Sequence, residues 1–220
     1  MVKIEDDKHI LWQAFLVAIA IFIIGIFLGT LFEESRIDKI KELYFDSETD
    51  LLDIQLQSNI LSYSRLGCDV AVEESRVFAD KIFFEALLLE KYDSANKITK
   101  DMVSIHRRYD LLRIMLWENL IEIKENCEEE IDVVVYLYEY INPSLEVQSK
   151  QNTFSNSLTS LKKKEGNNII LIPMAHDTNV KSLDLILKRF NISQFPVVII
   201  NEEIVVDKIS SVEDLKAYLN

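Results

Sequence analysis

The sequence has few of the residues that interrupt helices, bind metals or carry redox chemistry. Its 220 residues include four glycines, three prolines, two cysteines and three histidines. His9, His106 and His176 are scattered, and no pair has the spacing of a metal site. The sequence contains neither a glycine-rich phosphate loop nor a nucleophile elbow. We therefore expect no metal, no cofactor and no catalytic residue.

The chain also lacks a basic patch. It carries 24 Lys and Arg residues against 37 Asp and Glu residues, a formal net charge of −13. Binding of nucleic acid depends on Lys and Arg side chains that neutralise phosphates. This composition therefore argues against a nucleic-acid partner.

Hydrophobic residues, in contrast, are concentrated in one block near the N-terminus. The segment Ile10–Phe32 holds no charged residue, and a helix of this length spans about 34 Å, enough for a hydrocarbon core of about 30 Å. A cleaved signal peptide is the alternative, but its apolar region is shorter, about 7–15 residues, and ends in small residues. Here Leu31 and Phe32 are bulky. We predict a tail (1–9) and then an uncleaved single-pass membrane helix (10–32).

The charges around this helix leave its orientation open. Lys3 and Lys8 precede it, and Arg36, Lys39 and Lys41 follow it. The positive-inside rule counts Lys and Arg near the span, and here the two sides nearly tie.

Residues 33–129 are predicted to be helical, because Glu33–Glu130 contains no proline and only one glycine, Gly67. The first part of this region has an apolar seam at a spacing of three to four residues, interrupted by two serines: Ile37, Ile40, Tyr44, Ser47, Leu51, Ile54, Ser58 and Leu61. Polar seam positions weaken self-pairing. We therefore favour packing inside the chain over a homodimeric coiled coil through residues 37–66.

Two further helices are expected, from Cys68 to about Tyr92 and from about Asp93 or Ser94, as the N-cap, to Asn126. Their similar lengths and short connection predict an antiparallel hairpin. This arrangement brings Cys68 and Cys127 together, so a disulfide is favoured over two free thiols.

The last region, 130–220, alternates strand and helix patterns. "IDVVVYLYEY" and "IILIPM" are typical of buried strands, and "PVVIIN" and "EIVVDK" predict two strands joined by a tight, solvated turn at Glu202-Glu203. Helices are expected before Gly166, over Asn179–Phe190, and after a capping box at Ser210-x-x-Glu213. The order is β-α-β-α-β-β-α, with parallel pairing and a closing antiparallel hairpin. The fold class is therefore mixed, α+β with α/β.

Two stretches of this region resemble the thioredoxin-like superfamily. "KRFNISQFPVVIINEEIVVDKISSVEDLKAYL" resembles the second half of that fold, and the resemblance implies a cis bond between Phe195 and Pro196. "VVVYLYEYINPSLE" resembles the strand that leads to the family's Cys-x-x-Cys motif, but Ile141 and Ser144 occupy the cysteine positions. Exchange of disulfides needs a thiolate and a second sulfur. The resemblance therefore implies the fold without the oxidoreductase activity.

Three hypotheses about function follow. In the first, a redox-inactive, membrane-anchored module binds an extended segment of an unknown protein partner through Tyr140, Ile141, Asn142, Pro143, Ser144, Phe195 and Pro196. In the second, a membrane thiol oxidoreductase or redox sensor uses Cys68 and Cys127. Carboxylates beside both cysteines, Asp69 and the run Glu128–Glu130, oppose a lowered thiol pKa. The third hypothesis is a structural homodimer through residues 37–66.

A disulfide between Cys68 and Cys127 would also place residues 33–220 outside the cytoplasm.

His176-Asp177 and His106-Arg107-Arg108 are the other polar groups of note. One histidine beside one aspartate is weak evidence for catalysis, and we interpret the second group as a polar helix face.

Overall fold

The computed structural model describes residues 5–64, 68–93, 100–127, 131–208 and 211–219. The chain forms two compact units, Met1–Phe45 and Asp46–Asn220, which we describe separately. One long helix, α1 (Glu5–Ser64), runs from the first unit into the second. Residues 5–9, expected as a tail, are therefore helical.

The first unit contains the apolar part of α1. Within the described residues, Leu11–Phe32 is the one helical segment long and apolar enough to cross a membrane. Its side chains are exposed throughout, including large ones such as Trp12, Phe22 and Phe27. A helix that is apolar on all sides suits a bilayer or a deep core, and this segment is not buried.

The second unit begins with the last part of α1, which packs on helix α2 (Cys68–Asp93). Leu51 and Ile54 are buried, and the Ser47 hydroxyl donates hydrogen bonds of 3.0 and 2.9 Å to the Glu85 carboxylate. The polar Ser47 thus has a partner inside the chain, which confirms intramolecular packing for this stretch. The side chains of three other predicted seam residues lie outside the described residues: Ile37, Ser58 and Leu61.

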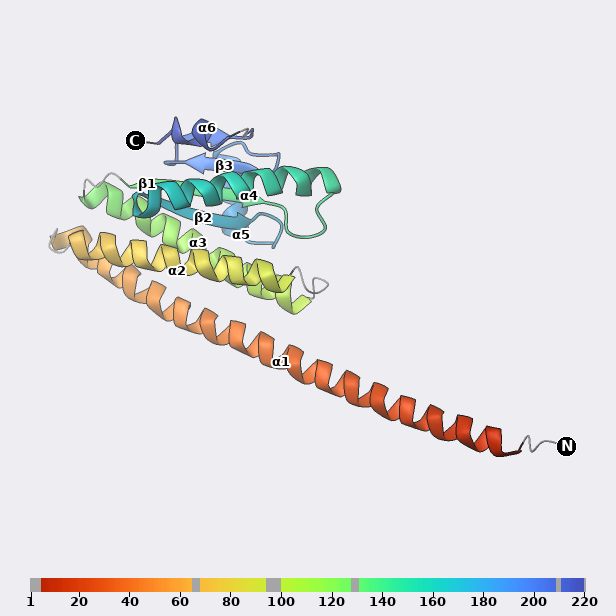
Figure 1. The fold of residues 1–220 in the computed structure, drawn as a ribbon. Helices are drawn as coiled ribbons and strands as arrows, with labels where there is room; N and C mark the ends of the chain where they lie inside the picture. Colours follow the sequence, from red (N-terminus) through yellow and green to blue (C-terminus); the bar gives the residue numbers. More distant parts are fainter. Residues whose placement is uncertain (1–4, 65–67, 94–99, 128–130, 209–210, 220) are drawn as a thin grey trace. The chain divides into compact units, whose positions relative to one another are not determined.

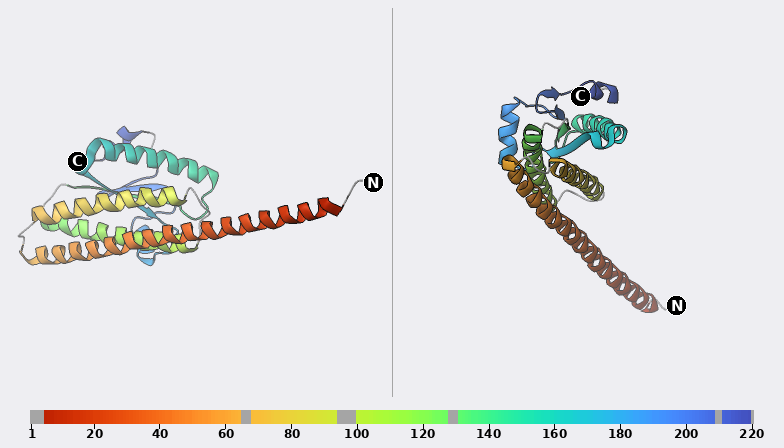
Figure 2. Two further views of the ribbon diagram at one scale, coloured as in Figure 1. Left: turned by 60° about the horizontal axis from the view of Figure 1, so that its bottom comes forward. Right: turned by 90° about the vertical axis from the view of Figure 1, so that its left-hand side faces the viewer.

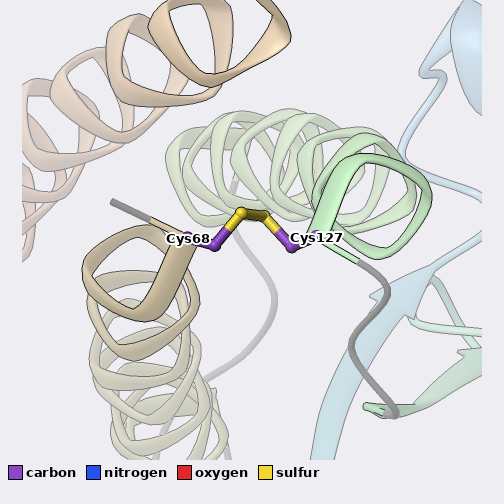
Figure 3. Close-up of a disulfide and its surroundings, with 2 residues drawn as sticks. All are labelled: Cys68 and Cys127. Atoms are coloured by element: carbon purple, nitrogen blue, oxygen red, sulfur yellow. A yellow bond between two sulfur atoms is a disulfide. The ribbon is translucent and has the colours of Figure 1, made fainter. Parts of the chain in front are cut away.

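Helix α2 and helix α3 (Lys100–Cys127) form the predicted hairpin. A disulfide joins Cys68 at the start of α2 to Cys127 at the end of α3, with 5.6 Å between the Cα atoms (Figure 3). The predicted disulfide is confirmed. Of the two residues expected to cap α3, Asp93 was wrong, because it is the last residue of α2. Ser94 lies outside the described residues.

Four strands form one sheet in the order β2-β1-β3-β4. β1 (Asp132–Tyr138) pairs in parallel with β2 (Ile169–Ala175) and antiparallel with β3 (Val197–Ile200), which pairs antiparallel with β4 (Ile204–Val206). Helices α4 (Leu145–Glu165), α5 (Lys181–Arg189) and α6 (Val212–Lys216) lie between and after the strands, and the short 3₁₀ helix η1 (Gly166–Asn168) follows α4. The predicted β-α-β-α-β-β-α order is confirmed, and so are the parallel pair of β1 and β2 and the closing antiparallel hairpin of β3 and β4. The antiparallel pairing of β3 with β1 was not predicted, because the alternation of strands and helices implied parallel pairing.

Helices cover both faces of this sheet (Figures 1 and 2). α4 lies on one face, and α3 and α5 lie on the other (Figure 2). Alternate residues of the strands build the core beneath α4 and α6, including Val134, Tyr136, Leu171 and Val198 together with Leu158 of α4. The remaining strand residues are buried on the opposite face, which explains why these strands read as continuous apolar runs.

The last helix begins one residue later than expected. Ser211 caps α6, accepting from the Asp214 N–H at 3.3 Å, while the Asp214 carboxylate accepts from the Ser211 N–H at 2.9 Å. The prediction of Ser210 and Glu213 was wrong: two adjacent Ser-x-x-acid pairs are present, and the box forms with Ser211 and Asp214.

The turn between β3 and β4 is not simply solvated. Asn201 and Glu202 both have positive φ, 51° and 60°, as in the type I′ turns that join twisted strands. Glu203 is exposed, but the Glu202 carboxylate accepts from the indole N–H of Trp117 at 2.7 Å and from the Lys124 ammonium at 3.3 Å. The prediction for Glu202 was therefore wrong, because α3 supplies partners that the local sequence does not reveal.

Candidate functional site

The predicted site residues come from loops that meet at one edge of the sheet. β1 and β2 are parallel and end at this edge, where Tyr138 pairs with Ala175. β3 runs in the opposite direction and starts here, with Val197 opposite Leu137. The topology therefore brings residues 139–144, 176–178 and 193–196 to the same edge.

Asp177 holds the segment after β1 in place. One carboxylate oxygen accepts from the Tyr140 N–H at 2.9 Å, and the other accepts from the Ile141 N–H at 2.5 Å. In addition, the His176 N–H donates to the Tyr138 carbonyl at 2.9 Å. A carboxylate that accepts two backbone N–H groups fixes both peptide units. Asp177, whose pairing with His176 was weak evidence for catalysis, is a positioning residue.

The loop before β3 contacts His176, the residue beside Asp177. The Phe195–Pro196 bond is cis, as the sequence predicted. The Phe195 ring stacks on the His176 ring with centroids 3.5 Å apart and planes 3° apart. Burial lowers the pKa of His176, although the charges of Asp177 and Glu139 oppose this shift. The stacked imidazole therefore ties the loop before β3 to the segment after β2.

The remaining predicted residues lie between β1 and α4. Asn142 is exposed and has a φ of 54°, and Pro143 is half-buried. The Ser144 hydroxyl is the N-cap of α4, accepting from the Val147 N–H at 3.3 Å. This hydroxyl is committed to the helix end, and Ile141 is half-buried, so neither residue presents a reactive group at this edge.

A buried charged group beneath this edge was missed by the sequence reasoning. Asp110 of α3 forms a 3.0 Å ion pair with Arg113 and accepts from the Thr178 hydroxyl at 2.8 Å and the Ala175 N–H at 3.2 Å. Both charged side chains are almost completely buried. Burial raises the pKa of Asp110, against the opposing effects of Arg113 and Thr178. An aspartate and an arginine three residues apart are typical of an exposed helix face, so the sequence carried no signal of this role.

His106 belongs to the same buried region. It is 4% exposed and stacks on Tyr140 with ring centroids 3.8 Å apart. The interpretation of His106-Arg107-Arg108 as a polar helix face was therefore wrong for His106 and right for Arg107 and Arg108, which are exposed.

Two of the predicted residues, Tyr140 and Pro143, also line a pocket of about 370 Å³. Its walls come from α2, α3, α4 and the strands β1 and β2. Phe195 and Pro196 are not among its lining residues. The edge of the sheet therefore has two features, the exposed loop before β3 and this pocket.

Comparisons with known proteins give no family for the chain. No family model matches it, and no curated protein matches it significantly. A solved structure described as "Structure of a malarial protein" is similar over 40% of this chain and 92% of that chain, with 20% identity and a TM-score of 0.32. A likeness at this level carries no argument about fold or function.

Proposed function

We propose that this chain is a membrane-anchored, redox-inactive protein of the thioredoxin-like superfamily that binds an extended segment of a partner protein. The β-α-β-α-β-β-α order of residues 132–216 supports the superfamily assignment. The positions of Ile141 and Ser144 support the absence of redox chemistry, since neither side chain supplies a sulfur. Fold alone does not define function, so the binding role depends on the edge of the sheet.

One observation carries the binding role. In the part of the chain that the structure describes, the backbones of Ser193, Gln194 and Phe195 make no hydrogen bond to other backbone groups. Ser193 and Gln194 are exposed, and this segment leads directly into β3. Unpaired backbone groups beside a sheet accept an added strand, in which main-chain hydrogen bonds supply affinity. Neighbouring side chains then supply specificity.

Selection from a peptide library tests this role. The full chain in lipid nanodiscs is the target for random twelve-residue peptides, and the selected peptides are measured against two variants. Gln194→Pro removes a backbone donor, whereas Gln194→Ala keeps it. We expect Gln194→Pro to weaken binding about tenfold, the loss of about one hydrogen bond, and Gln194→Ala to have little effect. Equal affinities for both variants would exclude pairing through this segment.

The anchor and the disulfide support a location for the domain. Leu11–Phe32 is long and apolar enough to cross a bilayer. Disulfides persist in oxidising compartments, so the bridge between Cys68 and Cys127 supports an extracytoplasmic position for the second unit. Mass-tag alkylation in intact membranes tests this placement. We expect labelling only after reduction, and two thiols that label without reduction would contradict it.

The alternative functions give different results in these experiments. A thiol oxidoreductase that uses Cys68 and Cys127 would have a cysteine that reacts rapidly near neutral pH once the bridge is reduced. A homodimer through residues 37–66 would crosslink to itself in membranes. Because Leu51 and Ile54 are already buried within the chain, such a dimer would need another face of this helix.

A further inference from the structure

The pocket beside the sheet edge is built largely of aromatic and apolar side chains. Tyr136, Tyr138 and Tyr140 line it from β1 and the residues that follow, Phe83 lines it from α2, and Leu158 lines it from α4. Its volume, about 370 Å³, lies in the range of about 300–1,000 Å³ typical of sites for small molecules. The pocket is therefore large enough for a ring-sized ligand.

The aromatic rings are arranged as flat surfaces. Tyr136 stacks with Tyr138 at a centroid distance of 5.5 Å and with Phe154 at 6.1 Å, and the planes in each pair are 23° apart. Tyr140 stacks with His106. Tyr136 and Tyr138 are alternate residues of β1 and share one face of the strand, and Tyr140 lines the same pocket from the segment after the strand. We call these three side chains the tyrosine row. Such a row favours a planar aromatic ligand, because offset ring stacking adds to the burial of apolar area.

Arg113 adds a specific polar requirement. It lines the pocket, and its side chain is 1% exposed. Its Nη1 pairs with Asp110, but its Nε finds no hydrogen-bond partner among the described residues. A buried donor without an acceptor destabilises the folded state, because its hydrogen bonds to water are not replaced. A ligand that brought an acceptor to this nitrogen would remove that destabilisation.

Carboxylates limit the charge of the ligand. Glu90 and Glu139 also line the pocket, Glu90 is exposed, and Glu139 is half-buried. The charge of Arg113 is already balanced by Asp110. An anionic ligand would pass close to Glu90 and Glu139 without finding an uncompensated cation, so an uncharged acceptor such as a carbonyl is favoured.

We propose that this pocket is a binding site for an uncharged aromatic compound with a carbonyl group, which stacks on the tyrosine row and accepts a hydrogen bond from Arg113 Nε. The site does not include the loop before β3, on which the binding role proposed above rests, but it shares Tyr140 and Pro143 with the predicted partner-binding residues. Because Gln194 does not line the pocket, Gln194→Pro tests peptide binding alone, and the two proposals can fail separately.

Fluorine NMR with the full chain in nanodiscs tests the proposal, with empty nanodiscs subtracted. The probe is 4-fluorobenzamide, a neutral ring with a carbonyl acceptor. We expect its fluorine signal to broaden and the broadening to saturate with concentration. Ser155→Phe fills the pocket from α4, whereas Asn156→Phe places the same ring on the exposed neighbouring residue, which does not line the pocket. Ser155→Phe should weaken binding at least about tenfold, and Asn156→Phe should leave it unchanged.

Two matched probes test the chemistry. 4-Fluorotoluene lacks the acceptor, and 4-fluorobenzoate carries a negative charge; each should bind about fivefold or more weakly than the amide. Thermal unfolding of both Phe variants by circular dichroism checks that they fold. Equal binding of 4-fluorotoluene would overturn the role of Arg113, and tighter binding of 4-fluorobenzoate would overturn the uncharged class. Absence of broadening, or equal binding to both Phe variants, would overturn the site.

Discussion

The two ends of the second unit are held together in different ways. At one end the hairpin of α2 and α3 is closed by a covalent bond between Cys68 and Cys127 (Figure 3). At the other end, the loops at the sheet edge are held by hydrogen bonds to Asp177 and by the stacking of His176 on Phe195. Both cysteines of the chain are therefore used at the end where the resemblance implies no sulfur chemistry, and none lies at the sheet edge.

This difference shows that hydrogen bonds and ring stacking hold the loops at this sheet edge without a disulfide. Asp177 supplies two acceptors, one for the Tyr140 N–H and one for the Ile141 N–H, and these hydrogen bonds fix the segment that follows β1. Asp110 on α3 then ties the hairpin to this edge, because it accepts hydrogen bonds from Ala175, the last residue of β2, and from Thr178 just after the strand. The two regions are distinct in chemistry but joined through one buried carboxylate.

The largest effect is expected when the buried carboxylate of Asp110 is removed. Asp110→Asn leaves Arg113 buried without its counter-charge, and the free energy of unfolding should fall by about 3–5 kcal/mol. Chemical denaturation of the purified chain measures the change. Asp184→Asn removes an exposed ion pair with Lys181 of the same spacing and should cost less than about 1 kcal/mol. Similar losses of stability in both variants would show that the Asp110–Arg113 ion pair contributes no more than an exposed one.

Removal of the disulfide should have the next largest effect. In the chain-entropy model, closing a loop of this length stabilises by about 4 kcal/mol, and measured values are often smaller. The double variant Cys68→Ser and Cys127→Ser should therefore unfold at a lower urea concentration than the oxidised chain. Reduced wild-type chain is the control and should match the double variant. A double variant as stable as the oxidised chain would exclude a structural role for the bridge.

A smaller and more local effect is expected at the sheet edge. Asp177→Asn keeps one acceptor and loses the other, which should cost about 1–3 kcal/mol. Because the loop from Tyr140 to Ser144 then loses a fixed peptide unit, selected peptides should bind more weakly. Asp207→Asn, an exposed change after β4, is the control for charge alone. If the Asp177 variant bound peptides with unchanged affinity, the clamped loop would not be part of the binding surface.

The smallest effect concerns the contact between α1 and the hairpin. Burial raises the pKa of Glu85 above its usual 4.5, with Ser47 and Lys81 opposing the shift. The folded state then holds a proton that the unfolded state releases, so stability falls as pH rises from about 4.5 through the raised pKa. Glu85→Gln keeps a hydrogen-bond acceptor for Ser47. Because glutamine does not titrate, the variant should lack this decrease of stability with pH. Its stability relative to wild type should therefore increase with pH in this window, as thermal unfolding at a series of pH values would show.

Much of the architecture could be predicted because it follows from local patterns. The strand order along the chain, the hairpin and the disulfide each depend on apolar spacing and on where breakers such as Gly166 stand. Boundaries were less certain where two neighbouring sequences fit the same motif, as in the caps at Ser210 and Ser211. Such alternatives differ by one residue, and the local sequence does not distinguish them.

The buried polar residues could not be predicted because their partners are distant in sequence. Asp110 bonds to residues more than 60 positions away, and Trp117 bonds to Glu202. On a helix these side chains follow the same spacing as an exposed polar face, so only the tertiary structure reveals that they are buried. The pocket was missed for the same reason, since its walls come from three helices and two strands.

The affinity of a selected peptide for the chain with and without the bridge tests the central claim most directly. Wild type and the Cys68→Ser, Cys127→Ser double variant are compared in nanodiscs at a temperature where both are folded. Recognition at a sheet edge without cysteines predicts equal dissociation constants and no covalent adduct, even with a peptide that contains cysteine. Loss of binding in the double variant, or a mixed disulfide between that peptide and Cys68 or Cys127, would contradict the separation of recognition from sulfur chemistry.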